Sequence, residues 1–141
     1  MKKFIFTFAI IGFVLVSCNK EKKAMKKLEG NWNVSAMTTD SAGVSVDSWA
    51  QFQAIGITSV TYNFQNCGTD VACDVYSTST GSFLGFPINN VDTLTYSVSE
   101  DGETITLDGD EASIDELTKS SLIMSQVDGN TTTIVTMEKA D

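Results

Sequence analysis

Apolar and polar residues alternate with a period of two along several short runs of this chain. Val60, Tyr62 and Phe64 fall on one side of residues 58–66, and the same alternation recurs over residues 92–98. This period is typical of a strand with one buried face, because successive side chains point to opposite faces. The chain also has one Pro, ten Gly and no long stretch of helical periodicity. These features predict an all-β domain.

Short turns join the strands predicted after Asp92. Turn residues occupy 100–103, 108–110 and 128–130, and each turn contains a Gly that can adopt positive φ. Consecutive strands joined this way form an antiparallel up-and-down meander. Counting from Trp32 gives roughly eight strands, enough to close a barrel around side chains or one small ligand.

Residues near position 50 leave two interpretations open. Trp49, Phe52 and Ile55 fall three residues apart, which fits a short helix capped by Asp47 or Ser48. The same stretch also fits an irregular segment or another strand.

The loop over residues 81–90 contains the single Pro of the chain. Phe83, Leu84 and Phe86 lie in it, flanked by Gly. We expect these side chains to fold back as a lid on the core. The alternative is an exposed contact with a ligand or partner.

The balance of charge excludes several classes of function. Residues 28–141 carry two Lys and seventeen acidic residues, a net charge of −15, and the chain has no His and no Arg. Such a surface repels nucleic acid, whose phosphates need basic partners. Ser-His-Asp and Cys-His catalysis, imidazole zinc sites and bidentate Arg clamps are unavailable. We therefore expect a binding protein rather than an enzyme, with no catalytic residue and no cofactor.

Five acidic residues gather around two predicted turns. They are Asp101, Glu103, Asp108, Asp110 and Glu111. Calcium favours such oxygen ligands, but the spacing is not that of an EF-hand, and turns recruit Asp for backbone reasons. We interpret the cluster as solvated turns and expect no metal site.

The first residues have the organisation of an export signal. Lys2 and Lys3 precede an uncharged run of thirteen residues, 4–16. This run is too short for a membrane span, which needs about 20 apolar residues, and it fits the h-region of a secretory signal. An exported protein meets an oxidising compartment, so Cys67 and Cys73 are expected to form a disulfide across a hairpin loop. A redox or metal pair is the alternative, although the spacing is not Cys-x-x-Cys.

The end of that signal, Leu15-Val16-Ser17-Cys18, resembles the lipobox of bacterial lipoproteins. The resemblance implies that residues 1–17 are removed and that Cys18 receives diacylglycerol and a further acyl chain, so that the protein is anchored in a membrane. Residues 18–27 would then be the lipidated Cys and a polar, Lys-rich, solvated tether. Asn19 favours the outer membrane of the cell envelope, because the Asp that marks inner-membrane retention is missing.

The segment Leu28-Glu29-Gly30-Asn31-Trp32 is similar to the opening of lipocalins, above all of bacterial lipocalin-like lipoproteins. This resemblance implies a lipocalin-like barrel over residues 28–141, with Trp32 plugging one end. Lipocalins pack an Arg over that Trp. In this chain Lys139, near the last predicted strand, could take its place.

We expect the barrel to bind a small apolar or amphipathic ligand as a monomer. Five aromatic residues are the candidate ligand contacts: Trp32, Tyr62, Phe64, Tyr76 and Tyr96. The alternative is that these rings fill the core, as they do in small barrels. A second function would be an interaction or inhibitor module, whose loops at 40–56 and 81–91 contact a protein or glycan at the cell envelope.

Overall fold

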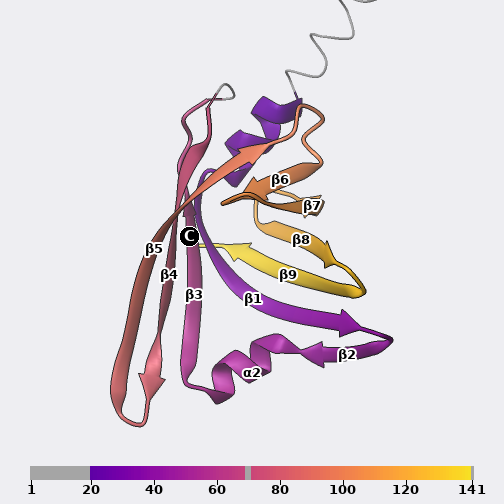
Figure 1. Ribbon diagram of the computed structural model, residues 1–141. Helices are drawn as coiled ribbons and strands as arrows, with labels where there is room; N and C mark the ends of the chain where they lie inside the picture. The colour runs from indigo at the N-terminus through magenta and orange to yellow at the C-terminus, as the bar shows by residue number, and fades with distance from the viewer. Residues whose placement is uncertain (1–19, 69–70, 141) are drawn as a thin grey trace, which may run out of the picture.

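The computed structural model describes residues 20–68 and 71–140 (Figure 1). The predicted signal peptide, the lipidation site Cys18 and Asn19 lie outside the described residues. A helix over residues 20–28 precedes the sheet. The remaining elements are β1 (Gly30–Ser41), β2 (Val44–Asp47), α2 (Ser48–Ala54), β3 (Ile57–Phe64), β4 (Cys73–Phe83), β5 (Phe86–Val98), β6 (Thr104–Leu107), β7 (Asp110–Leu117), β8 (Ser121–Asp128) and β9 (Thr131–Lys139).

One antiparallel sheet closes on itself to form the barrel. The strand order is β2-β1-β3-β4-β5-β6-β7-β8-β9, and β1 also pairs with β9. Eight strands therefore form the closed barrel, while β2 is an extra strand on the distal half of β1 (Ser41 pairs with Val44). The all-β, roughly eight-stranded up-and-down barrel predicted from alternation and turns is confirmed.

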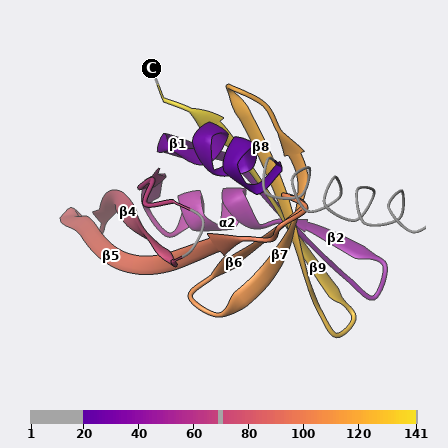
Figure 2. The same cartoon turned by 90° about the horizontal axis from the view of Figure 1, so that it is seen from above.

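The barrel is closed at one end and splayed at the other. β5 pairs with β4 from Phe86 to Tyr96, but with β6 only through Tyr96, Ser97 and Val98. Likewise β1 meets β3 only over residues 30–33. Below these pairings the hairpins diverge, as the view along the barrel shows (Figure 2). The splayed half therefore has a gap between β5 and the β6–β7 hairpin.

The helix over residues 20–28 lies across the closed end of the barrel (Figure 2). Ala24, Met25 and Leu28 are buried in the core, whereas the lysines between them are exposed. The solvated tether expected over residues 18–27 is therefore wrong for the residues described here. Apolar side chains three and four positions apart form one face of a helix, and that face needs cover. No helix in the described part of the chain is long and apolar enough to cross a membrane.

Trp32 plugs the closed end, as predicted. Its side chain is fully buried, and its indole Nε1 donates a hydrogen bond of 2.6 Å to the carbonyl of Leu28. The Lys139 ammonium lies 5.1 Å from the centre of the indole ring and donates to the carbonyl of Lys27 at 3.0 Å. Lys139 thus takes the position expected for the missing Arg, as a cation over an aromatic face.

A β-bulge changes the face that β1 presents to the core. Trp32 and Val34 point inward and are buried, but the register against β9 shifts between Val34 and Ala36. Unbroken alternation along β1 would place Ala36 on this same face, but Ala36 is exposed. The extra residue in a bulge reverses the alternation beyond it, so Met37 takes the inward position opposite Val135.

The open question near position 50 resolves as the short helix α2. The Asp47 carboxylate caps it by accepting a hydrogen bond of 2.9 Å from the backbone N–H of Ala50. Trp49 packs against the core from this helix.

Cys67 and Cys73 form the predicted disulfide, with their Cα atoms 5.6 Å apart. Cys73 is buried at the start of β4. The bridge therefore ties the β3–β4 connection to the closed end of the barrel.

The packed helix generates a stability prediction. Leu28→Ala removes a fully buried side chain and leaves a cavity, so the free energy of unfolding should fall by about 2–5 kcal/mol in chemical denaturation. Lys26→Ala, on the exposed face of the same helix, is the matched control and should change it by about 0.5 kcal/mol or less. A Leu28→Ala cost as small as that of the control would show that the helix is not part of the core.

Candidate ligand-binding site

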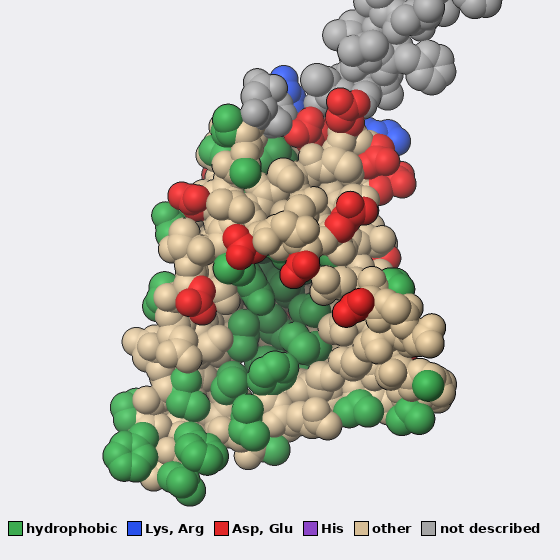
Figure 3. Space-filling model, viewed as in Figure 1, with side chains coloured by type: hydrophobic (Ala, Val, Ile, Leu, Met, Phe, Trp, Pro, Cys, Tyr) green, Lys and Arg blue, Asp and Glu red, His purple; other side chains and the backbone are tan. Residues whose placement is uncertain are grey.

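An apolar hollow opens into the splayed half of the barrel (Figure 3). It has a volume of about 160 Å³. Its lining comes from five strands and consists of Tyr62, Leu107, Ala112, Met124, Gln126, Thr133, Val135 and Met137. A cavity of about 150 Å³ takes up a molecule the size of benzene, whereas complete ligand pockets span about 300–1,000 Å³. The hollow therefore fits the apolar part of a ligand, and the remainder of the ligand would lie outside the hollow, in the splayed half of the barrel.

Cross-strand pairs arrange the lining by depth. Met124 pairs with Val135, and one step further out Gln126 pairs with Thr133. Paired residues share a face of the sheet, so the hollow becomes polar toward the splayed end. Ala112 contributes only a methyl group from β7, which leaves space that a larger side chain would fill.

Three of the five predicted ligand contacts are core residues instead. Trp32, Phe64 and Tyr96 are almost completely buried, and none lines the hollow. The rings of Phe64 and Tyr96 pack edge to face with their centres 5.1 Å apart. The alternative interpretation, that these aromatic residues fill the barrel core, describes them correctly. They occupy the closed end, where their strands are paired on both edges.

The other two predicted contacts lie on opposite faces of the sheet. Tyr62 lines the hollow from β3 and pairs with Ser77. Tyr76 is the neighbour of Ser77 on β4, so its side chain points outward, and it is 40 % exposed. Tyr76 therefore cannot contact a ligand inside the barrel.

Sequence reasoning missed most of the lining. The candidate ligand contacts predicted from the sequence include none of Leu107, Ala112, Met124 and Val135. Their alternation places them on the inner face, but alternation does not reveal depth along the barrel axis. The signal that distinguishes them is the short β6, because a strand of four residues cannot cover the lower half of its neighbour β5.

The loops at 81–91 and 40–56 lie at the splayed end of the molecule (Figure 1). Phe83, Leu84 and Phe86 were expected to cover the core, but they are 53, 82 and 75 % exposed. The expectation is wrong because β4 and β5 continue as a hairpin beyond the barrel, so their tip has no core to cover. Leu84 has a φ of 51°, an uncommon conformation for a residue with a side chain.

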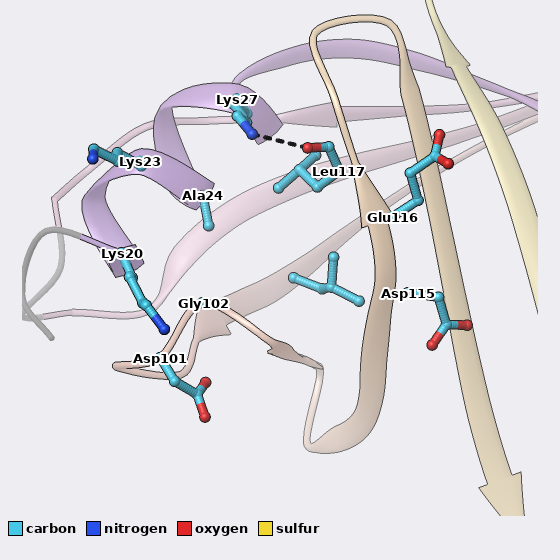
Figure 4. Close-up of a pocket in the computed structure, with 10 residues that line it drawn as sticks. Lys20, Lys23, Ala24, Lys27, Asp101, Gly102, Asp115, Glu116 and Leu117 are labelled. Carbon is cyan, nitrogen blue, oxygen red and sulfur yellow. Dashed lines mark hydrogen bonds between the residues drawn. The ribbon is translucent and has the colours of Figure 1, made fainter.

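A second cleft lies at the other end, between the helix over residues 20–28 and β7 (Figure 4). Lys20, Lys23 and Lys27 line it from the helix, and Asp101, Asp115 and Glu116 are among the residues that line the other side, with the Asp115 and Glu116 carboxylates directed away from the helix (Figure 4). The Lys27 ammonium donates to the carbonyl of Leu117 at 3.0 Å. Because charged side chains form most of its lining, this cleft of about 260 Å³ does not resemble an apolar ligand site.

Asp101 shows the structural role of an acidic residue in a turn, because its carboxylate accepts hydrogen bonds from neighbouring turn residues. Hydrogen bonds from the Ser99 hydroxyl and then from the Glu103 backbone N–H hold the pKa of its carboxyl below the ordinary value, with a further contribution from Lys20. These bonds organise the β5–β6 turn. Among the residues described, no group of His, Cys, Asp or Glu is arranged to hold a metal ion.

Comparison with solved structures supports the fold. Japanin from Rhipicephalus appendiculatus, solved with bound cholesterol, matches with a TM-score of 0.58 at 7 % identity, over 78 % of this chain and 74 % of its own. The siderocalin Ex-FABP matches with a TM-score of 0.43 at 13 % identity, over 82 % and 74 % of the two chains. At such identities the likeness to Japanin shows the fold alone, a lipocalin-like barrel. No protein-family model matches the chain, and no curated protein matches it.

Tyr96 gives a prediction about pH. Burial, with Glu29 nearby, raises its pKa to about 12, and its hydroxyl donates to the carbonyl of Gln65 at 2.6 Å. A folded-state pKa above the unfolded value of about 10 means that the stability from Tyr96 is fully present below pH 10 and is lost as pH rises toward 12.

Absorbance at 295 nm, which follows tyrosinate, should show an ionisation centred near pH 12 in the native protein. Tyr96→Phe should remove that step. An unchanged titration in the variant would show that another group is responsible.

Proposed function

We propose that this protein is a membrane-anchored lipoprotein whose lipocalin-like barrel binds a small apolar or amphipathic ligand. The observation that carries the proposal is the hollow itself, which Tyr62, Met124 and Val135 line inside an otherwise packed barrel. Burying apolar ligand surface there contributes about 2.5 kcal/mol per 100 Å². The ligand enters through the gap between β5 and the β6–β7 hairpin.

The solved neighbour adds support for a ligand of this class. Japanin, which shares the fold, was solved with cholesterol. A sterol ring or an acyl chain presents the apolar surface that the hollow of the present chain can cover. The proposal for this chain stands on its own hollow, because fold alone does not fix function.

The anchor is part of the same proposal. Cys18 would carry the lipid, and the helix over residues 20–28 would hold the closed end of the barrel beside the membrane. The exposed lysines of that helix are suited to headgroups that carry negative charge. The gap and the hollow would then face away from the anchoring bilayer, on the periplasmic side or at the cell surface.

Filling the hollow tests the binding function. Ala112→Trp should weaken binding of the neutral apolar probe N-phenyl-1-naphthylamine by about tenfold or more, equivalent to about 1.4 kcal/mol. The matched control is Ser113→Trp, one residue along β7 and on the outer face. Fluorescence titration reports both affinities, and circular dichroism checks that both variants fold. Equal affinity in wild type and Ala112→Trp would contradict binding in the hollow.

One observation favours a second function, a loop-mediated contact with a partner protein. Leu84 holds an exposed apolar side chain in an unfavourable backbone conformation, between the exposed Phe83 and Phe86. Strain of this kind gathers at functional sites. Failure of the wild-type barrel to bind any apolar probe would favour this loop-mediated contact over ligand binding.

Lipidation has its own test. In a Gram-negative host fed radiolabelled palmitate, the full chain should incorporate label and fractionate with membranes. Cys18→Ser should do neither, while Ser17→Ala, which keeps a small residue before the Cys, should behave as wild type. Label retained in Cys18→Ser would contradict an anchor at this residue.

A further inference from the structure

Two acidic residues of the inner barrel face lie near the margin of the hollow, beside the gap. Asp110 is two residues before Ala112 on β7, and Asp92 is two residues before Leu94 on β5, which packs against the core. Side chains two apart on a strand share a face, so both carboxylates are on the inner side, and both are exposed. They stand on the two sides of the gap, since the β6–β7 turn meets β5 through the bond from Asp108 N to Thr95 O, 2.8 Å.

Positive charge lies at the opposite end. Lys139 is held over the Trp32 ring at the closed end, and Lys119 lies in the β7–β8 turn beside Leu117, whose carbonyl accepts from the helix. These are the only lysines of the described residues after the helix. In the space-filling view, acidic side chains border the green hollow while blue appears only at the top (Figure 3).

The interior of the barrel offers no free polar group that could offset the negative charge at the gap. In the described part of the chain, every buried side-chain nitrogen or oxygen atom already has a hydrogen-bond partner. The polar groups among the lining side chains are the Gln126 amide and the hydroxyls of Thr133 and Tyr62, and none of them is a cation. These groups can donate to or accept from a hydroxyl, an amide or an ammonium, but they carry no charge to pair with an anion.

We infer that the hollow selects amphiphiles whose polar group is neutral or positively charged and rejects those with a carboxylate. The inference rests on the proposed ligand-binding function and names its ligand class. A fatty-acid carboxylate at the gap would lose part of its hydration beside Asp92 and Asp110 without gaining a cation. An alcohol of the same length loses little, and an ammonium gains two carboxylate neighbours.

A matched series of ligands tests the inference. Dodecylamine, dodecanol and laurate share one chain length and differ in the polar group. Each competes with N-phenyl-1-naphthylamine for residues 19–141, which contain every described element of the barrel. At pH 7.5 and low salt, laurate should bind at least about tenfold more weakly than dodecanol, with dodecylamine equal to or tighter than dodecanol. Raising salt to about 0.5 M should narrow the difference between amine and acid, because the gap is exposed.

Substitution of the two carboxylates tests whether they cause the selectivity against laurate. In Asp92→Asn/Asp110→Asn the laurate penalty should shrink to about threefold or less. Asp74→Asn/Glu111→Gln removes the same number of charges from the outer faces of β4 and β7 and should leave the penalty unchanged.

Three results would overturn the account, and they are distinguishable. Laurate binding as tightly as dodecanol would overturn the charge selectivity and leave the ligand-binding function intact. An unchanged laurate penalty in Asp92→Asn/Asp110→Asn would overturn the role of these two carboxylates. Failure of all three ligands and of the probe to bind wild type would contradict the proposed function, and with it the inference.

Discussion

The packing of Trp32 holds the closed end of this barrel together. The indole donates to the carbonyl of Leu28 and lies beneath the ammonium of Lys139, which in turn donates to the carbonyl of Lys27. This one ring therefore ties the N-terminal helix to both the first and the last strand of the barrel. Closure between β1 and β9 depends on the same meeting point, since Trp32 and Lys139 are paired in the register of the two strands. A lysine suffices here because the position needs a cation over the ring rather than the two-pronged hydrogen bonding of Arg.

Concentrating the packing at one end leaves the other end free to open. The largest buried side chains, Trp32, Tyr96 and Phe64, gather where strand pairing is complete. Beyond that level β5 has no partner on one edge, and the apolar side chains of the inner face surround a hollow instead of one another. A small barrel that closed along its full length would fill its interior with side chains. The splayed half is thus the feature that makes ligand binding compatible with a stable domain of this size.

The sequence predicted the fold because the fold depends on local patterns. Alternation identified the strands, Gly in the turns identified the hairpins, and the spacing of Cys67 and Cys73 suited a bridged hairpin loop. The prediction from the sequence was wrong for residues 20–28, because the many lysines there make the segment look like a polar tether although Ala24, Met25 and Leu28 form an apolar helix face. It failed again at Ala36, since a bulge leaves no clear mark in an alternating pattern.

The site was harder to predict than the fold, for a physical reason. Period-two patterns say which face a side chain occupies but not how far it lies from the closed end. Tyr62 and Phe64 share a face of β3, yet one lines the hollow and the other is core. How far a side chain lies from the closed end depends on the lengths of strands that are distant in sequence, such as β6. Those lengths can be used only once the strand pairing is known. The charge distribution around the gap has the same origin, because the strand topology, rather than sequence spacing, places Asp92 and Asp110 on its two sides.

The central claim is that one end of the barrel is packed and the other binds the ligand. NMR of the methionine methyl groups tests this claim most directly. The chain has five Met residues, of which Met124 and Met137 line the hollow, while Met25 is buried on the core-facing side of the helix at the closed end. With ¹³C-labelled methyl groups, saturating dodecanol should shift the signals of Met124 and Met137 and leave that of Met25 in place. Shifts confined to Met25, or no shift at either lining residue under conditions where dodecanol binds, would contradict the account.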